Sequence, residues 1–381
     1  MNHTNILTID TAKILSNLEV IRTAAGSAEV IPVLKANAYG MDLHMLADLL
    51  RAHGIRRFAV GDPLDAQKLR DWGFQEEEIL VLRSTTSPTD IRTILHACAT
   101  ATVGSYDAAV ALNGMAEAEG MACDVHIKID TGLGRYGFTP NELERVLAVF
   151  RYLTSLNVTG MFTQYANAAT SRKKTQAQHD AFMQMVDKVW QAGFQPGMLH
   201  ASDSEGLFYA KAPNLDAVRI GSALTGRIRA RGEYGLQPVG RLESAVAEIN
   251  WLPKGATIGE GSDYVTKQAM EVAIIPVGYA DGFLLQPIRC DFRLGSRLRH
   301  ALRVLFGRSR YYVNVGGKRA RIIGRVGATH TTVDATGLNL SPGTAAWFEV
   351  DPVFVPERIP RRYTTPPPVM PENTADYVIE D

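Results

Sequence analysis

The chain has 381 residues, of which 46% are hydrophobic, so it can bury a large core and is longer than a usual single domain. Forty basic residues balance forty acidic ones, and this zero net charge argues against a general attraction to nucleic acids or anionic membranes. Three cysteines without a CxxC spacing argue against both a disulfide framework and a thiolate metal site.

The N-terminal residues lack the basic and apolar regions of a signal peptide, and no apolar run of about eighteen residues occurs. We therefore expect a cytoplasmic protein without a membrane segment, whose partner is a small-molecule substrate. No zinc-binding helix or phosphate-binding glycine loop is found. The scattered histidines, His200 among them, are interpreted as core or surface residues, so no metal is expected.

From about residue 29 to residue 225, short apolar or β-branched runs alternate with longer amphipathic segments, which is typical of a parallel sheet with crossover helices. The expected strands are Val30–Leu34, Arg57–Val60, Ile79–Leu82, Thr100–Val103, Val125–Ile129, Val158–Thr163, Gly197–Ala201 and Ala217–Ile220. Eight β/α units predict a TIM-type barrel with its functional residues at the C-terminal strand ends. The alternative is an open doubly wound sheet, but no GxGxxG follows the first strand.

After about residue 228, alternating stretches separated by glycines predict a second, mainly β domain. We expect the barrel domain over residues 1–228, the β domain over residues 229–365, and a loosely held, proline-rich acidic tail over residues 366–381. Arginines crowd between Arg289 and Arg325, which predicts a solvated helix or a subunit contact. Nucleic-acid binding would also need a recognisable module, and none is clear.

Lys35 follows the first expected strand directly, in the sequence Ile-Pro-Val-Leu-Lys-Ala-Asn-Ala-Tyr-Gly (31–40). At the C-terminal end of a barrel strand an ammonium group points into the barrel mouth, where desolvation and neighbouring cations lower its pKa. Such an amine can form a Schiff base. The alternative is an ordinary exposed lysine at a strand end, and Lys35 alone does not decide between them.

An ordered set of motifs, spread over most of the chain, decides the interpretation of Lys35. The motifs are Lys-Ala-Asn-Ala-Tyr-Gly (35–40), His-Ile-Lys-Ile-Asp-Thr-Gly-Leu-Gly-Arg-Tyr-Gly-Phe (126–138), Leu-Asp-Ala-Val-Arg-Ile-Gly-Ser-Ala-Leu-Thr-Gly (215–226), Val-Gly-Tyr-Ala-Asp-Gly-Phe (277–283) and Gly-Arg-Val (324–326). In this order and spacing the chain resembles the alanine racemase family from about residue 5 to residue 363. The first and fourth motifs are the most specific.

The resemblance implies a barrel that binds pyridoxal 5'-phosphate (PLP), followed by a β domain, in a homodimer with shared active sites. Lys35 would carry the cofactor as a Schiff base and exchange the α-proton of an amino acid on one face. Tyr279 would exchange it on the other face, in the active site of the partner subunit. Inversion at Cα requires two such bases on opposite faces.

The resemblance also assigns the cofactor's other contacts. Arg219 would face the pyridine nitrogen and, always protonated, keep that nitrogen unprotonated; the alternative is an ion pair with Asp216. The phosphate would be bound by Tyr39 and Ser204 and by the backbone amides of Gly221 and Ser222 near a helix N-terminus. Tyr39 could instead be a core aromatic residue, and Ser204 the N-cap of the following helix.

Substrate contacts are implied for Arg135, whose planar guanidinium suits a carboxylate, and for the backbone at Ala328. In the family the lysine that matches Lys128 is often carbamylated and holds the arginine. The sequence leaves open whether Lys128 is modified or forms an ordinary buried arrangement with Asp130.

Departures from the family pattern lie mainly on the substrate side. The chain reads Gly-Arg-Val-Gly-Ala-Thr-His (324–330) where the family usually has Gly-Arg-Val-(Cys or Ser)-Met-Asp. Gln164 stands where a histidine is usual, Asp203 where an asparagine is usual, and Thr225 where a tyrosine is usual. The smaller residues Ala328 and Thr225 could admit a substrate side chain larger than methyl. One or two extra methylenes change the discrimination between substrates by only a few kcal/mol. Alanine is therefore the first choice of substrate, and another or larger amino acid, such as serine, is the alternative.

Two other classes compete with an active racemase. A PLP-dependent decarboxylase on the same kind of barrel would carry a C-terminal Cys-Asp pair for protonation, whereas Cys290-Asp291 lies in the basic segment. A PLP-binding protein without catalysis would end after the barrel. The β domain and Tyr279 argue against it, although the altered loop at 327–330 leaves a catalytically inactive relative open.

Overall fold

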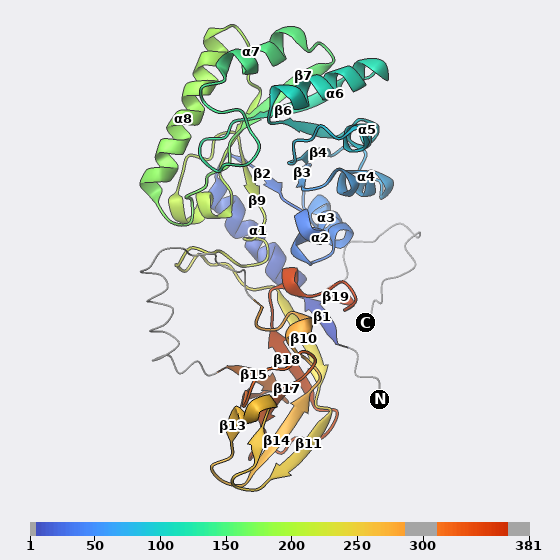
Figure 1. The fold of residues 1–381 in the computed structure, drawn as a ribbon, viewed down its shortest axis with the longest axis vertical. Helices are drawn as coiled ribbons and strands as arrows, with labels where there is room; N and C mark the ends of the chain where they lie inside the picture. Colours follow the sequence, from blue (N-terminus) through green and yellow to red (C-terminus); the bar gives the residue numbers. More distant parts are fainter. Residues whose placement is uncertain (1–4, 286–310, 365–381) are drawn as a thin grey trace. The chain divides into compact units, whose positions relative to one another are not determined.

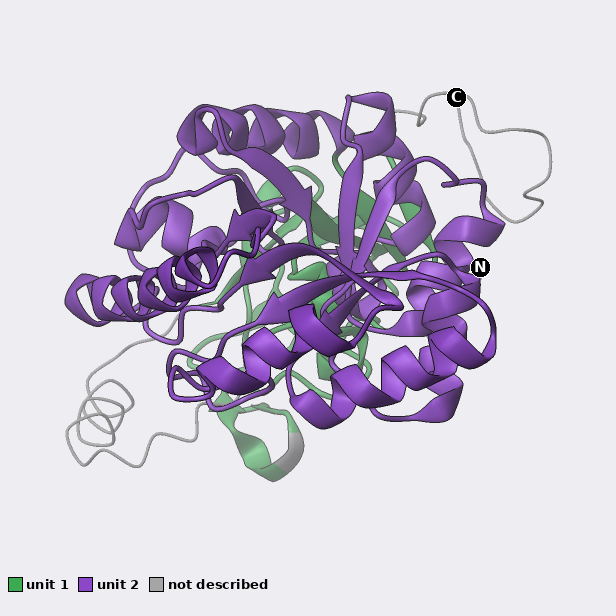
Figure 2. Cartoon of the chain, turned by 90° about the horizontal axis from the view of Figure 1, so that it is seen from above, with its two compact units in different colours: residues 1–10, 240–364, 376–381 green, residues 11–239, 365–375 purple. Residues whose placement is uncertain are grey.

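The computed structural model describes residues 5–285 and 311–364. Two compact units divide the chain: one runs from Thr11 to Val239, and the other combines the segment up to Asp10 with Gly240–Thr364. In Figure 2 residues 11–239, called the first unit in the text, are purple (unit 2 in the key), and the other unit, called the second unit in the text, is green (unit 1 in the key). The tail expected at 366–381 lies outside the described residues, as does the part of the arginine-rich segment from 289 to 310.

The first unit contains eight parallel strands in the order β2-β9-β8-β7-β6-β5-β4-β3. Their bounds are β2 Glu29–Pro32, β3 Arg57–Val60, β4 Glu78–Val81, β5 Thr100–Val103, β6 Cys123–Lys128, β7 Leu156–Phe162, β8 Met198–His200 and β9 Ala217–Ile220. A parallel bridge between Val33 and Ala59 links the two ends of this order, so the sheet is a nearly closed barrel. The expected eight-stranded barrel is confirmed.

Helices surround these strands, as Figure 2 shows. Their bounds are α1 Thr11–Ala25, α2 Lys35–Tyr39, α3 Leu43–Ala52, α4 Pro63–Asp71, α5 Pro88–His96, α6 Tyr106–Ala118, α7 Leu143–Tyr152, α8 Arg172–Gln191 and the π-helix η1 Gly206–Ala210. Several begin where the sequence supplies a cap: the side chain of Ser105 accepts from Ala108 N, and that of Ser171 accepts from Lys174 N. Asp62 and Ser87 cap α4 and α5, each of which has proline in its first turn.

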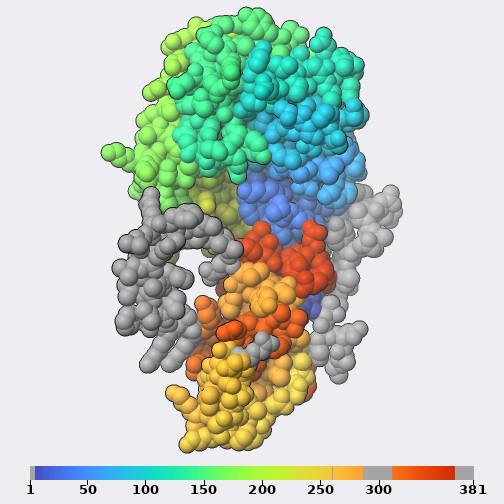
Figure 3. Space-filling model, viewed as in Figure 1, coloured from blue at the N-terminus to red at the C-terminus, as the bar shows by residue number. Residues whose placement is uncertain are grey.

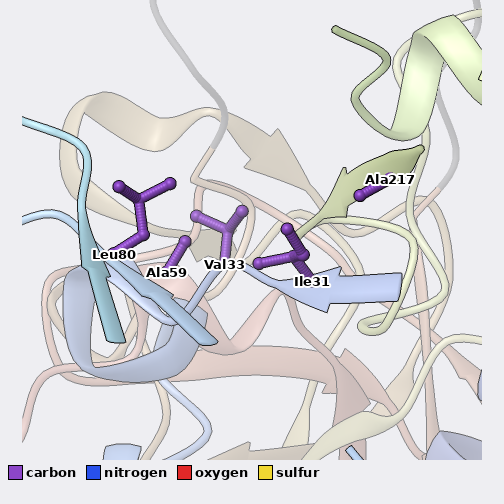
Figure 4. Packing of buried hydrophobic residues seen from close by; sticks show 5 residues of the cluster. All are labelled: Ile31, Val33, Ala59, Leu80 and Ala217. Atoms are coloured by element: carbon purple, nitrogen blue, oxygen red, sulfur yellow. The ribbon is translucent and has the colours of Figure 1, made fainter. Parts of the chain in front are cut away.

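Apolar side chains fill the space between neighbouring barrel strands. Figure 4 shows one cluster, in which Ile31, Val33, Ala59, Leu80 and Ala217 are all buried. In this cluster small and large residues alternate from β9 through β2 and β3 to β4, so this part of the barrel interior is a packed core and not a channel. Open space for a ligand is therefore expected only at the strand ends.

The second unit is built from short strands and 3-10 turns. Its strands are β1 Ile6–Ile9, β10 Gly240–Ala245, β11 Glu248–Leu252, β12 Thr257–Ile258, β13 Tyr264–Val265, β14 Met270–Ile275, β15 Tyr312–Val315, β16 Lys318–Arg321, β17 Thr331–Asp334, β18 Ala345–Glu349 and β19 Arg361–Tyr363, and its 3-10 turns are η2 Glu260–Ser262, η3 Tyr279–Asp281 and η4 Pro352–Phe354. A six-stranded sheet has the order β16-β15-β18-β10-β1-β19, and β11-β14-β17 form a second sheet. The space-filling view in Figure 3 shows the part of this unit that follows residue 239 in yellow to red.

The position of strand β1 differs from the expected domain boundaries, which placed residues 1–228 in the barrel domain. It pairs antiparallel with β10 and parallel with β19, so the N-terminal residues belong to the β unit and not to the barrel (Figure 1). Leu7 and Ile9 are fully buried there. This strand was not among the expected ones, because the four residues Ile-Leu-Thr-Ile show no clear alternation and the pairing partners lie more than two hundred residues away. In the described part of the chain, no helix is long and apolar enough to cross a membrane.

Candidate active site

The candidate site begins at a strained turn directly after β2. Residues Ala36 to Tyr39 have φ values of 54°, 51°, 53° and 56°, so four successive non-glycine residues lie in the left-handed region. This conformation costs about 1–2 kcal/mol per L-residue. The turn is held by Ala38 N, which donates to Leu34 O at 3.0 Å, and by Asn37 Oδ1, which accepts from Leu43 N at 2.7 Å. Strain of this kind points to a functional constraint on Lys35 at the start of the turn.

Lys35 has the electrostatics of a reactive amine. Its side chain keeps exposed surface at the barrel mouth, and the surrounding walls still desolvate the ammonium enough to lower its pKa. The positive charge of Arg135 lowers that pKa further, while Asp203 and Glu205 oppose the shift. A lowered pKa increases the fraction of free amine near neutral pH, which is the nucleophilic form.

Tyr39 reaches from the end of β2 to the end of β9. The Nζ atom of Lys35 lies 5.6 Å from the centre of the Tyr39 ring. A Cβ atom on Gly221 would lie only 2.1 Å from the Tyr39 hydroxyl oxygen, so the close approach of these two groups requires glycine. Tyr39 is therefore a polar group held over the strand end, and the alternative of a purely apolar core residue is not supported.

Ser204 and the turn after β9 lie beside each other. The hydroxyl of Ser204, a residue only 2% exposed, accepts from Ala223 N at 3.2 Å, and it does not cap the helix that follows. The helix N-terminus expected at Gly221 and Ser222 is not present in this described segment. Instead, Leu224 N donates to Gly221 O and Thr225 N donates to Ser222 O, which forms a succession of tight turns. Such turns still direct backbone amides toward one side.

Replacing Gly221 by alanine tests this close approach. The added Cβ is expected to displace the Tyr39 hydroxyl and to weaken PLP binding by roughly tenfold to a hundredfold, since overpacking costs about 1–3 kcal/mol. Titrating the apoprotein with PLP and following the absorbance gives the Kd. The control variant is Gly114→Ala, at a glycine of α6 where an added Cβ would meet no atom from elsewhere in the chain within 4 Å, and there the Kd should stay constant. Unaltered PLP affinity in Gly221→Ala would show that Tyr39 and Gly221 do not form part of the cofactor site.

Arg219 is buried beneath the same strand ends, with 2% of its surface exposed. One guanidinium nitrogen donates to His200 Nδ1 at 2.6 Å, and the other donates to Thr163 O at 2.7 Å and to Ala201 O at 3.1 Å. Among the described residues no ion pair joins Arg219 to Asp216, whose carboxylate accepts from Leu199 N. Burial lowers the pKa of Arg219 to about 10, so the guanidinium remains protonated at neutral pH.

Gln164 and Asp203, two of the departures from the family pattern, form a second contact to Arg219. Arg219 donates to Gln164 Oε1 at 3.0 Å, and Gln164 Nε2 donates to Asp203 Oδ2 at 2.7 Å. Gly206 N donates to the other carboxylate oxygen of Asp203 at 2.8 Å. Burial, and then the nearby Glu205, raise the pKa of the Asp203 carboxyl. The substituted pair therefore connects a buried acid to the guanidinium through one amide.

His126 and His200 belong to this site, although neither was predicted to have a functional role. His126 Nδ1 and His200 Nε2 lie 2.8 Å apart in the buried interior. A signal for His126 was present: in β6 the polar residues Asp124, His126 and Lys128 alternate, whereas strands of a parallel barrel are usually apolar on both faces. Alternating polar side chains in such a strand indicate one face that points to a polar interior.

Lys128 lies on the same strand as His126 and is 4% exposed. Its Nζ donates to the backbone carbonyl of Arg135 at 3.1 Å. Asp130 holds the intervening loop through hydrogen bonds from Gly132 N and Leu133 N. Burial, followed by the positive charges of Arg135 and Arg219, lowers the pKa of Lys128 to about 8. A neutral amine of this kind is the form that reacts with carbon dioxide.

The lowered pKa of Lys128 predicts a specific pH dependence of stability. Between pH 8 and 10.5 the unfolded chain holds a proton on this lysine that the folded chain has released, so stability should rise with pH across that window. The quantity to compare is the free energy of unfolding of the wild-type protein, without carbamylation, minus that of Lys128→Met. This difference should increase by roughly 3 kcal/mol from pH 7.5 to 10.5. Denaturant unfolding at several pH values measures this difference. A constant difference would show that Lys128 is not a buried free amine.

Tyr279 and Ala328 lie in the other unit, next to each other. Tyr279 N donates to Gly327 O and Ala280 N donates to Ala328 O, both at 3.0 Å. The side chain of Tyr279 is exposed, with 51% of its surface accessible. A cavity of about 360 Å³ beside it is lined by Tyr279, Phe283, Leu284, Tyr311, Ile322, Gly324, Arg325 and Val326. Among the described residues no group of His, Cys, Asp and Glu side chains is placed to hold a metal ion.

Comparison with known proteins places this chain in one class, the racemases built from a barrel and a β unit. Residues 9–228 match the alanine racemase N-terminal domain, and residues 239–350 match the alanine racemase C-terminal domain. The alanine racemase of Desulforamulus reducens is 32% identical over 334 residues, which is 86% of this chain and 84% of that protein. That of Methanococcus maripaludis is 30% identical over 374 residues, which is 93% of this chain and 97% of that protein.

Solved structures show the same architecture. Alanine racemase from Streptomyces coelicolor A3(2) superposes with a TM-score of 0.82 at 26% identity and covers 95% of this chain and 98% of its own. The enzyme from Bartonella henselae, solved with covalently bound pyridoxal phosphate, gives 0.76 at 22% identity, with 94% and 99% covered. The chain belongs to the alanine racemase family and is an alanine racemase-like isomerase. This family assignment argues against the alternative that the protein is a PLP-dependent decarboxylase.

Proposed function

We propose that the protein interconverts L- and D-alanine by PLP-dependent exchange of the α-proton between two bases. The observation that carries this proposal is the position of Lys35: an amine of lowered pKa on a strained left-handed turn, at the end of a barrel strand. The family depends on PLP, and its Bartonella henselae member was solved with that cofactor covalently bound. We place the reaction in the cytoplasm.

The residues of the barrel unit fit PLP. Lys35 would hold its aldehyde carbon, and the buried guanidinium of Arg219 would donate to the pyridine nitrogen. Tyr39, Ser204 and the amides of Gly221 and Ser222 would bind the phosphate, consistent with the missing Cβ at Gly221 and the buried hydroxyl of Ser204. The chemistry that PLP would supply here is an electron sink, which would acidify the Cα proton of a bound amino acid.

In the proposed mechanism Lys35 and the phenol of Tyr279 move one proton each at Cα. Lys35, as a free amine, would exchange the α-proton on one face of the substrate. Tyr279 of the partner subunit exchanges it on the opposite face. Arg135 binds the substrate carboxylate together with the backbone at Ala328, which orients Cα between the two bases. Inversion follows when one base removes the proton and the other returns one.

A homodimer with shared active sites is part of this proposal. The support is the exposure of apolar surface around Tyr279: Tyr279 is 51% exposed, Leu284 39% and Tyr311 48%. Large exposed apolar side chains that gather beside one cavity are typical of an interaction surface. A second copy of the chain that covers this surface would bring its barrel mouth to Tyr279.

The substrate is tested by incubating the PLP-loaded protein with single L-amino acids in deuterated water. For L-alanine we expect deuterium at Cα and accumulation of D-alanine, measured by NMR and chiral chromatography. Serine and larger amino acids form the comparison panel, because Ala328 and Thr225 replace larger residues usual in the family. Retention of protium by alanine, with exchange of serine, would transfer the proposal to serine. No exchange with any member of the panel would reject catalysis.

A modified Lys128 is a further proposal for this site. The amine of lowered pKa lies against the Arg135 carbonyl, so a carbamate there would bring a negative charge close to the Arg135 segment. Intact-protein mass spectrometry near neutral pH in bicarbonate should reveal one added carbon dioxide that is lost on acidification. In Lys128→Met the adduct should be absent. An identical adduct in both proteins would place the modification elsewhere.

A further inference from the structure

A line of polar side chains runs through the packed barrel and ends at Arg219. Glu78, at the start of β4, binds Arg57 Nε through Oε2 at 2.5 Å, and its Oε1 lies 3.7 Å from His126 Nε2. His126 Nδ1 lies 2.8 Å from His200 Nε2. His200 Nδ1 lies 2.6 Å from a guanidinium nitrogen of Arg219. Both histidines and Arg219 are at most 2% exposed.

The hydrogen-bonding chemistry of arginine determines which nitrogen donates and which accepts in each contact of this line. Arginine has only donors, so His200 Nδ1 must accept, and the single proton of a neutral His200 must therefore lie on Nε2. That proton can only be donated to His126 Nδ1, which in turn places the His126 proton on Nε2, facing the Glu78 carboxylate. Each ring thus has one permitted tautomer, selected by its neighbour.

Both rings are neutral across the pH range in which the protein would work. Burial, followed by the charge of Arg219, lowers the pKa of His126 to about 3. The same causes, with His126 in addition, lower the pKa of His200 well below its usual value. Phe162 stacks on His200 at 4.8 Å between ring centres and 8° between planes, which fixes the plane of that ring.

The backbone beside His126 is shaped to admit its ring. A Cβ on Gly160 would lie 2.6 Å from His126 Nε2 and 2.8 Å from its Cε1. The register of β6 against β7 shifts between Val125 and His126, so that Thr159 is left out of the pairing. A bulge and a glycine both cost strand stability, and at this position they leave space for one polar ring.

We propose that His126 is a positioning residue, which acts through His200 to hold Arg219 in the orientation that serves the cofactor. The inference rests on the proposed function in one respect, because it takes Arg219 as the partner of the pyridine nitrogen. His126 itself touches neither cofactor nor substrate. It holds the proton of His200 on Nε2, and the opposite tautomer would direct a donor at Arg219.

The tautomers give a test that needs no activity. Protein labelled with ¹⁵N-histidine is examined by NMR, with and without PLP, from pH 6 to 8. His126→Asn and His200→Asn variants assign the signals. We expect His126 and His200 as neutral rings protonated on Nε2. A proton on Nδ1 of either ring, or a charged ring at pH 6, would overturn the proposal whether or not the protein racemises alanine.

Two substitutions test the consequence for Arg219. His126→Phe retains a ring without an acceptor, and we expect a fall in kcat/KM of about tenfold or more together with a shift of the absorbance maximum of bound PLP. His126→Asn keeps an acceptor near the position of Nδ1 and should restore both to within about threefold. His96→Phe, at an exposed helical histidine, is the control. Wild-type absorbance and kcat/KM in His126→Phe would contradict the proposal. If His126→Phe does not fold, the proposal is tested by the kcat/KM and absorbance of His126→Asn and by the histidine tautomers measured by NMR.

Discussion

The variant Lys35→Ala is expected to bind PLP only weakly and to lose racemisation by about four orders of magnitude or more. In the proposed mechanism two contributions would disappear together, because the same amine would attach the cofactor and move the proton on one face. The absorbance of lysine-bound PLP should vanish from the purified variant, and chiral chromatography should detect no D-alanine above the background. The control is Lys68→Ala, at an exposed lysine of α4 paired with Asp65, which should match the unmodified protein.

Several features of the turn make this expectation specific to Lys35. The four left-handed residues that follow it cost several kcal/mol, and the fold keeps this conformation where it presents one amine. Lys128 is the other amine of lowered pKa beside this site, but it is buried against the Arg135 carbonyl. Persistence of the bound-cofactor absorbance in Lys35→Ala would mean that another lysine forms the imine.

The variant Tyr279→Phe should retain PLP and lose racemisation by about 10²–10⁴-fold, the usual contribution of one acid or base. It should also separate the two faces of the substrate. In deuterated water one enantiomer should still exchange its α-proton through Lys35 without inversion, while the other should not exchange. NMR of the separated enantiomers measures this asymmetry. Equal exchange of both enantiomers would show that Tyr279 is not the second base.

Mixed dimers test whether Tyr279 acts across a subunit boundary. Lys35→Ala and Tyr279→Phe proteins are each expected to be inactive, but a mixed dimer would contain one site with both native residues. Activity should therefore rise after mixing, toward about one quarter of the unmodified rate per site for random exchange. Tagged subunits confirm that exchange has occurred. Proven exchange without any recovery of activity would count against a shared site.

The barrel could be predicted almost entirely from the sequence. Each of its strands is a short apolar run flanked by amphipathic segments, and this local pattern is sufficient because neighbouring strands in space are largely consecutive in sequence. Strand β1 illustrates the limit of this approach. Its four residues, Ile-Leu-Thr-Ile, were not predicted as a strand, because the pairing with β10 and β19 and the burial of Leu7 and Ile9 depend on residues far away in the sequence.

The residues of the candidate site could be predicted only where they lie within a recognisable sequence motif. Lys35 follows a strand end, and the structure places it there, but the left-handed turn after it has no propensity signal in Ala-Asn-Ala-Tyr. The contacts of Arg219 with Gln164 and His200 join strands far apart in the sequence, so spacing could not reveal them. The alternating polar residues of β6 were the one local sign of a polar barrel interior.

The attachment of PLP to Lys35 can be tested most directly by borohydride reduction of the PLP-loaded protein, followed by proteolysis and mass spectrometry. We expect a single peptide with a reduced pyridoxyl phosphate group, and fragmentation should place that group on the ε-amine of Lys35. A pyridoxyl group on Lys128 or on another lysine, or a reduced protein without any such group, would rule out Lys35 as the attachment site.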